Sequence, residues 1–257
     1  MLTGAVPDGE NFGAVSESLR PVRIGRFQGY ARSGFDLRLH WDSITGYIAN
    51  GVPYYSMKDW RKVYRISLSP SSAIYVKDVD ESRHEKRNFW RSMFSTEAAR
   101  YYRNYRRMRR LGVATPPVLF VLGERRGLFW VRSLMATSEL VGYLPWSDFF
   151  EAHLAAPQFN QLKDDVLKET ACFAAKFHRL GYYLSLGGSN VFVRKNYDRA
   201  LNNIALIDLD HLQRAMFGRM PARRRMRNLQ RFRETMKSTV GLSTADCETF
   251  DRYYDQF

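Results

Sequence analysis

Three side chains of the types that hold phosphate or metal ions stand out: Lys77, Asn190 and Asp208. Asp208 follows four largely apolar residues, 204–207, which predict a buried strand that ends at this carboxylate. A lone buried carboxylate is costly unless a cation or a metal ion meets it, so Asp208 is a candidate metal ligand. Lys77 closes the strand-like run "AIYVK" and is either a surface lysine or a cation for phosphate. Asn190 follows "LGGS", where it could simply cap a turn.

Length and composition predict a globular protein. The chain has 257 residues, 45% of them hydrophobic, with 17 Phe and 15 Tyr, enough for one large domain or two small lobes. It contains no run of 18 apolar residues and no signal-peptide pattern, which favours a cytosolic protein. The two cysteines, Cys172 and Cys247, lie far apart without metal-site spacing, so we expect ordinary thiols and no zinc site or disulfide.

The charge balance predicts an anionic partner. There are 40 Lys+Arg against 26 Asp+Glu, a formal net charge of +14, and the excess is concentrated in 100–110 and 223–233. In the first stretch four arginines recur at helical spacing on one side: Arg100, Arg103, Arg107 and Arg110. This cationic face is either a solvated surface or a contact for phosphorylated lipid headgroups or nucleic acid. Nucleic acid is the least favoured, because no stacked-aromatic platform or known binding module is present.

The amino-terminal half of the sequence predicts mainly strands. Residues 1–45 have weak periodicity and are predicted to be a variable extension that could add an edge strand. Alternating residues then predict a β-hairpin at 60–68 and 73–79, and a helix follows at 87–111, ended by Gly112. Two further strands are expected within 115–136, around a turn at 123–127.

The carboxy-terminal half predicts mainly helices. They are expected at 147–156, with Ser147 as N-cap, at 161–181, at 221–239 and from about 243. A short strand pair at 189–195 and 203–210 interrupts them. Strands with one helix followed by helices with a strand pair indicate a bilobal α+β fold.

Five stretches in order carry a family resemblance. They are "AIYVK" (73–77), "RRMRRLGVATPPV" (106–118), "FHRLGYYLSLGGSNVFV" (177–193), "IALIDLDHLQRA" (204–215) and the helical stretch 224–254. Together they resemble the protein-kinase-like fold and, within it, the bacterial lipopolysaccharide core heptose/Kdo kinase family. The resemblance covers roughly residues 55–255. It implies a kinase-like domain at 46–257, with a β-rich N-lobe at about 46–134 and a mainly helical C-lobe at about 135–257.

The resemblance implies a nucleotide site with one member missing. Lys77 would hold the phosphates of ATP, and Asn190 and Asp208 would hold Mg²⁺. The kinase aspartate that orients the acceptor hydroxyl falls on Ser185, or on Leu186 in the alternative register. Neither is a carboxylate, and the sequence has no Asp or Glu between Glu169 and Asp198. The histidine that usually precedes this aspartate is replaced as well, by Tyr183.

Other parts of the implied site are also altered. The helix glutamate that partners the strand lysine falls on Tyr101, while Glu97, one turn earlier on the same face, could reach Lys77. No GxGxxG is present, and Gly46 and Gly51 are the candidates for a phosphate-covering loop.

Three further residues near the motifs have expected roles. We expect Asp210 and His211 near the site, Asp210 either supporting other residues or replacing the missing base. His178 matches a position that packs inside the C-lobe, so we expect a structural residue.

Two functions from different classes follow from the resemblance. The first is an ATP-dependent kinase acting on a hydroxyl of a lipopolysaccharide inner-core sugar, heptose or Kdo, at the cytoplasmic face of the inner membrane, with the arginine face on the glycolipid. The second is a pseudokinase that acts by contacting a partner, such as an active kinase of the same pathway. Loss of a general base costs about a hundred- to ten-thousandfold in rate. The lack of a carboxylate around Ser185 therefore favours the pseudokinase, without excluding a slow transferase.

Overall fold

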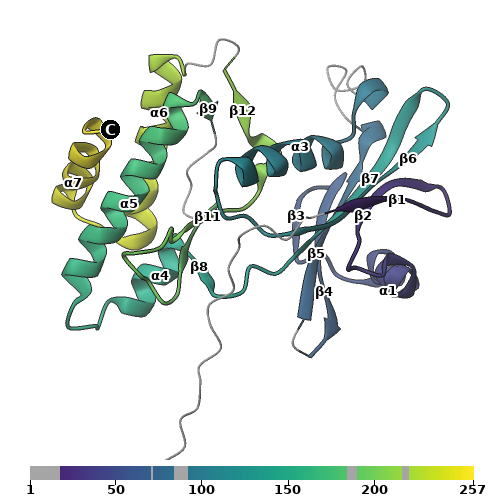
Figure 1. Ribbon diagram of the computed structural model, residues 1–257, viewed down its shortest axis with the longest axis horizontal. Helices are drawn as coiled ribbons and strands as arrows, with labels where there is room; N and C mark the ends of the chain where they lie inside the picture. The colour runs from purple at the N-terminus through teal and green to yellow at the C-terminus, as the bar shows by residue number, and fades with distance from the viewer. Residues whose placement is uncertain (1–17, 71, 84–91, 184–189, 216–219) are drawn as a thin grey trace, which may run out of the picture.

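The computed structural model describes residues 18–70, 72–83, 92–183, 190–215 and 220–257. They form a β-rich amino-terminal lobe and a mainly helical carboxy-terminal lobe, which lie side by side in Figure 1. This arrangement confirms the predicted bilobal α+β fold.

The amino-terminal lobe is built on an antiparallel sheet of seven strands. Its strands, in the order β1-β2-β6-β7-β5-β4-β3 across the sheet, are β1 (Leu19–Ile24), β2 (Phe27–Arg32), β6 (Val118–Arg126), β7 (Phe129–Ser138), β5 (Ser72–Asp80), β4 (Arg61–Ser69) and β3 (Tyr55–Lys58). β4 and β5 are the predicted hairpin, and β6 and β7 are the second predicted pair. The turn between β6 and β7 lies at Gly127, with φ of +56°, and Leu128, at the end of the predicted range. Gly123 instead lies inside β6, where the ring of Trp130 leaves no room for a Cβ.

The two faces of this sheet are covered by different helices. Helix α1 (Leu37–Asn50) packs Ile44 against a cluster that includes Ile74 and Val76. Helix α3 (Glu97–Arg110) belongs with Val121 to the second, larger hydrophobic cluster. Since neighbouring residues of a strand point to opposite faces, Lys77 is directed to the α3 side of the sheet.

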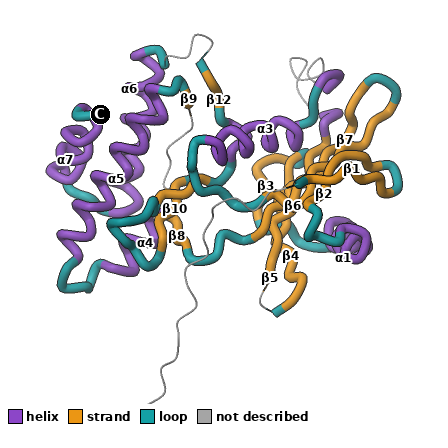
Figure 2. Tube along the Cα trace, in the orientation of Figure 1, coloured by secondary structure: helices purple, strands orange, loops and turns teal. Residues whose placement is uncertain are grey.

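The described part of the carboxy-terminal lobe is mainly helical (Figure 2). Its four helices pack around aromatic side chains that include Trp146, Phe150 and Phe232. The helices are α4 (Trp146–His153), α5 (Phe159–Arg179), α6 (Ala222–Val240) and α7 (Thr244–Asp255). Two small sheets accompany them, made of β8 (Tyr143–Pro145), β10 (Val191–Arg194) and β11 (Ile204–Leu206), and of β9 (Tyr182–Tyr183) and β12 (Gln213–Arg214). The predicted strand pair is thus β10 and β11, which pair antiparallel.

Three local predictions were wrong. Gly46 lies inside α1 and Gly51 caps its end, so neither belongs to a phosphate-covering loop. Ser147 lies inside α4, whose N-cap is Pro145. The continuous helix predicted at 87–111 is interrupted: residues 92–94 are helical, residues 95 and 96 are not, and α3 begins at Glu97, where the Thr96 hydroxyl accepts the Ala99 N–H at 3.0 Å and caps the helix. The predicted start at residue 87 lies outside the described residues.

The predicted extension contributes to the amino-terminal lobe. Its described part, 18–45, supplies β1 at one edge of the sheet, β2 beside it and most of α1. The boundary placed at residue 45 therefore falls inside a helix, and the rest of the domain division stays a prediction.

Candidate active site

Two of the residues singled out in the sequence meet between the lobes. Lys77 Nζ, on β5, lies 2.9 Å from Oδ1 of Asp208, and it also contacts the carboxylate of Asp210. Asp208 follows β11, and its backbone has φ of 55°, a left-handed conformation that is uncommon for a residue with a side chain. Such conformations persist where the surroundings stabilise them, and many occur at functional sites.

Arg61 is a second cation at this point and was missed in the sequence. It is the first residue of β4, and its side chain is only 7% exposed. Its Nε lies 3.0 Å from Glu97 Oε1, and its Nη2 lies 3.4 Å from Asp208 Oδ1 and also contacts Asp210. Two cations and three carboxylates therefore form one group, the ion-pair cluster: Arg61, Lys77, Glu97, Asp208 and Asp210.

Mutual attraction keeps the cations of the ion-pair cluster charged. Burial by itself would lower the pKa of Lys77, but Asp210 and then Asp208 outweigh it and the pKa is raised. The pKa of Arg61 is raised in the same way, against burial, by Asp210, Glu97 and Asp208.

The carboxylates Asp208 and Glu97 respond in opposite directions. Burial would raise the pKa of Asp208, but Lys77 and then Arg61 hold it well below its usual range. Burial, assisted by Asp210, raises the pKa of Glu97 despite Arg61 and Lys77.

Helix α3 meets Lys77 through an aromatic ring. Lys77 Nζ lies 5.6 Å from the ring centroid of Tyr101, the position where the resemblance placed a glutamate. A cation over an aromatic face is attracted by the ring quadrupole, which partly replaces the missing charge. Glu97, one turn earlier, forms its ion pair with Arg61 and not with Lys77.

Polar contacts fix both ends of the α3 side of the site. Glu81 accepts the Glu97 N–H at 2.5 Å and the Ser133 hydroxyl at 2.6 Å, which holds the first turn of α3 against β7. Further along, Asn104 Nδ2 donates to the carbonyl oxygens of Leu209 at 2.9 Å and Leu212 at 3.2 Å. These bonds attach the segment that carries Asp208 and Asp210 to the helix.

Asn190 lies beside the end of the strand that leads to Asp208. Its carbonyl oxygen accepts the N–H of Ile207 at 3.1 Å. The structure therefore places the backbone of Asn190 beside the residue that precedes Asp208. Ser185 and the side chain of His211 lie outside the described residues.

Glu169 and Asp198 bound the stretch of the sequence that lacks a carboxylate, and both accept hydrogen bonds from the 198–203 turn. Glu169 accepts the N–H of Asn203 at 2.6 Å and its side-chain amide at 3.0 Å. Asp198 accepts the N–H of Ala200 at 2.9 Å. Both carboxylates thus shape the 198–203 turn.

The oxygen ligands of the site fit a hard divalent cation. Oδ1 of Asp210 is buried and accepts no hydrogen bond from the described residues. Asp208 is 30% exposed beside it, and carboxylate and amide oxygens are what Mg²⁺ binds. No group of three or more Asp, Glu, His or Cys suited to a metal exists in the described part of the chain. Asp208 and Asp210 would therefore need phosphate or water oxygens to complete the shell of a Mg²⁺ ion, with Asn190 as the further ligand that the resemblance implies.

The arginines of α3 form a cationic surface. Arg100 donates to the Ser95 carbonyl at 3.2 Å and Arg103 to the Ser95 hydroxyl at 3.1 Å. Burial, then Arg100 and Arg107, lowers the pKa of Arg103. Among the described residues no carboxylate forms an ion pair with Arg100, Arg103 or Arg107, and Arg107 and Arg110 are exposed, so this face of α3 is positively charged.

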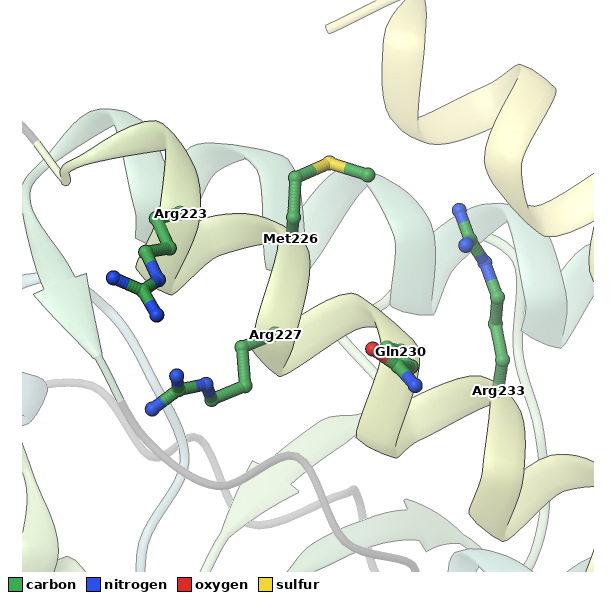
Figure 3. A pocket seen from close by; sticks show the side chains of 5 residues that line it. All are labelled: Arg223, Met226, Arg227, Gln230 and Arg233. Carbon is green, nitrogen blue, oxygen red and sulfur yellow. The ribbon is translucent and has the colours of Figure 1, made fainter.

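A second basic surface lies on α6 (Figure 3). It is a pocket of about 320 Å³ lined by Arg223, Met226, Arg227, Gln230 and Arg233. Arg233 Nη2 pairs with Asp251 at 2.7 Å. Figure 3 shows the guanidinium groups of Arg223 and Arg227 extending to the same side of the helix.

His178 is buried inside the carboxy-terminal lobe, as predicted. Its ring nitrogens lie 2.8 Å from the Tyr254 hydroxyl and 2.8 Å from Asn228 Oδ1, which joins α5 to α7 and α6. Burial lowers its pKa. His178 is therefore a structural residue.

The sequence matches the family model described as "Lipopolysaccharide kinase (Kdo/WaaP) family" over residues 54–254. The chain belongs to this family. Membership supports a role in modification of the lipopolysaccharide core. No curated protein sequence matches the chain significantly. No helix in the described ranges is long and apolar enough to cross a membrane.

Solved structures support the kinase-like fold. A structure of WaaP in complex with acyl carrier protein has a TM-score of 0.62 and 20% sequence identity, covering 86% of each chain. The amicoumacin kinase hAmiN in complex with AMP-PNP, Ca²⁺ and Ami has a TM-score of 0.47 and 12% identity, covering 86% of this chain and 79% of that one. The first confirms the fold predicted from the sequence.

The strand register of the predicted hairpin could have identified Arg61 as a neighbour of Lys77. Arg61 pairs with Val79 and Val63 pairs with Lys77, so Arg61 and Lys77 point to the same face from neighbouring strands. An arginine diagonal to the strand lysine on that face is within reach of the same ligands.

Proposed function

We propose that this chain is a nucleotide-binding protein of lipopolysaccharide core assembly whose phosphotransfer is strongly impaired. The observation that carries the proposal is the absence of any Asp or Glu between Glu169 and Asp198, where the catalytic carboxylate should lie. Such a group orients and deprotonates the acceptor hydroxyl, and its loss costs about a hundred- to ten-thousandfold in rate.

The ion-pair cluster offers a poor substitute for the missing base. The Asp210 side chain is 3% exposed and meets both Arg61 and Lys77, which leaves an acceptor hydroxyl little access to it. Asp208 is more exposed, but Lys77 holds it ionised and a weak base, and it is the candidate metal ligand. A general base must reach the acceptor within hydrogen-bond distance, which argues against Asp210 in that role.

The same cluster supports nucleotide binding. Lys77 is a cation with a side chain only 12% exposed and directed to the α3 side of the sheet, and Asp208 and Asp210 supply carboxylate oxygens beside it. Asn190 is the further ligand implied by the family resemblance. Mg²⁺ bound there would neutralise charge on the phosphates of ATP. Lys77 would orient those phosphates through its charge.

A thermal-shift experiment tests nucleotide binding. A ligand that binds the native state raises the unfolding temperature by mass action, so Mg²⁺ with ATP should stabilise the wild type. Lys77→Ala and Asp208→Asn should each abolish the shift, because they remove the phosphate cation and the metal ligand. Lys62→Ala, on the opposite face of the same hairpin, should retain it. No shift in the wild type at millimolar ATP would reject nucleotide binding.

The degree of impairment is tested by restoring the carboxylate. Transfer of labelled phosphate from ATP to lipopolysaccharide core acceptors should be very slow in the wild type. Ser185→Asp should raise it by about a hundredfold or more if the rest of the site is intact. Fast transfer by the wild type would instead establish the alternative, an active kinase for a heptose or Kdo hydroxyl.

The anionic partner is proposed to meet the arginine face of α3. A phosphorylated glycolipid at an anionic membrane surface would be attracted to Arg100, Arg103, Arg107 and Arg110, each basic residue near such a surface contributing about 1 kcal/mol. The interaction should weaken as salt rises.

Vesicle sedimentation tests this surface. Vesicles containing anionic phospholipid should bind the wild type more than zwitterionic vesicles do, and Arg103→Glu with Arg107→Glu should remove the difference. The same charge change at the exposed Arg20 and Arg23 of β1 is the control. If only Arg223→Glu with Arg227→Glu removes binding, the contact lies on α6 and the α3 assignment is wrong.

An impaired kinase would act through a partner protein. We propose an active kinase of the same pathway, and acyl carrier protein is a second candidate because the WaaP structure contains it. Size-exclusion chromatography of the purified chain mixed with each candidate tests this, since a stable complex elutes earlier than either protein alone.

A further inference from the structure

The β3–β4 hairpin enters the site without a glycine-rich loop. Lys58 of β3 pairs with Arg61 of β4, so the connection is the two residues Asp59 and Trp60. Kinases cover the nucleotide phosphates with a glycine-rich loop that follows the first strand. A two-residue turn without glycine offers few backbone N–H groups for that purpose, so the hairpin must contribute by other means.

What the hairpin presents is a buried arginine. Arg61 and Lys77 lie on one face of neighbouring strands, at diagonal positions from which long side chains reach the same point. Both contact Asp208 and Asp210. The two cations therefore converge on the oxygens that we assign to Mg²⁺, which in kinases lie next to the nucleotide phosphates.

Glu97 holds the guanidinium in place. Its Oε1 lies 3.0 Å from Arg61 Nε, while Arg61 Nη2 is directed toward the aspartates. This ion pair at Nε restrains the planar guanidinium and with it the Nη donors, and such donors match phosphate oxygens in pairs. An ammonium group lacks this geometry, so Arg61 adds a contact that Lys77 cannot duplicate.

We propose that Arg61 is a second ligand for the nucleotide phosphates, with Glu97 as its positioning residue. The inference rests on the proposed nucleotide binding. In this protein the Arg61 side chain would contact the nucleotide phosphates in place of the backbone N–H groups of a glycine-rich loop. With Mg²⁺ on the aspartate oxygens, Arg61 Nη2 would donate to phosphate oxygens instead of to Asp208 and Asp210.

Calorimetric titration of the full chain with ATP and with adenosine, both in the presence of Mg²⁺, tests the proposal. Arg61→Lys keeps the charge but loses the paired donors. It should weaken ATP binding about tenfold or more, since hydrogen bonds to charged groups are worth at least that factor, and leave the adenosine Kd unchanged. Arg65→Lys, an exposed arginine on the same strand that pairs with Glu139 at 3.3 Å, should change neither.

The outcomes distinguish the role of Arg61 from nucleotide binding itself. If the wild type binds ATP and Arg61→Lys binds it equally well, or loses ATP and adenosine alike, Arg61 is not a phosphate ligand. If the wild type binds no ATP, nucleotide binding and the role of Arg61 are both rejected. Should Arg61→Lys fail to fold, Glu97→Gln decides: it loosens the anchor of Arg61 and should weaken ATP but not adenosine. Equal affinities in that variant overturn the proposal.

Discussion

The molecule buries two polar groups of opposite electrical character. The ion-pair cluster joins the amino-terminal sheet, α3 and the 208–210 segment through five charged side chains. The second group, His178, Asn228 and Tyr254, joins three helices of the carboxy-terminal lobe through two hydrogen bonds of 2.8 Å. Both groups are largely shielded from water, but only the first contains formal charges at neutral pH.

The difference shows which group can do chemistry. Buried charges are expensive to assemble and can exchange one ionic partner for another, as a site for Mg²⁺ and phosphates requires. A neutral group whose hydrogen bonds are satisfied within the protein stabilises packing and has little to offer a charged ligand. The charged group should therefore respond to removal of one partner and to nucleotide, and the neutral group to pH.

The largest effect is expected from removing a cation of the ion-pair cluster. Arg61→Met should lower the free energy of unfolding by about 3–5 kcal/mol, because Glu97 and Asp210 remain buried with too little positive charge. Urea unfolding measures the change. Arg65→Met on the same strand is the control and should change little, because its ion pair with Glu139 is solvent-exposed. A similar small change for both variants would mean that the cluster is more hydrated than the structure indicates.

A smaller effect is expected where the charged cluster is attached to α3. Asn104→Ala removes the donors to Leu209 and Leu212, so it should cost about 1–3 kcal/mol. It should also weaken the ATP-induced thermal shift, since Asp208 and Asp210 lose their attachment. The matched control is Asn50→Ala, which removes a bond within the exposed end of α1. Full retention of the ATP shift in Asn104→Ala would show that the segment is held by other contacts.

The smallest effect is expected for the neutral group, in the pH dependence of the free energy of unfolding. Burial lowers the pKa of His178 from about 6.5, so below that pH the unfolded chain binds a proton that the folded chain resists. This contribution to the free energy of unfolding is therefore present above about pH 6.5 and is lost as the pH falls below it, through the lowered pKa of the folded state. His178→Gln should have a shallower decline in unfolding free energy over that interval than the wild type. Parallel curves would assign the decline to other groups.

Much of the fold followed from local patterns. The hairpin of β4 and β5, the helices α5 and α6 and the strand pair of β10 and β11 were predicted within a few residues, because their periodicity is strong. The break at residues 95 and 96, just before α3, was not predicted, because the cap at Thr96 decided it. Gly46 was misread as part of a loop because a single glycine is tolerated inside a helix.

The candidate site also could be predicted only in part. Lys77, Asn190 and Asp208 could be named from motifs. The structure pairs Lys77 with Asp208 and places the backbone of Asn190 beside Ile207, and the roles of all three in binding stay predictions. Glu97 was placed on the correct face of α3, but its partner is Arg61. The partner of Glu97 depends on which strand residue reaches α3, and the spacing of residues along the helix does not predict this.

The sequence by itself determined the order of the elements, the family, and the absence of a carboxylate between Glu169 and Asp198, because these are properties of residue types and their spacing along the chain. Only the tertiary structure decided that Arg61 joins Lys77, that Tyr101 contacts Lys77 through its ring, and that Asp210 is buried between two cations. The physical reason is that ion pairs select partners by distance and burial, and both arise when α3, the sheet and the 208–210 segment pack together.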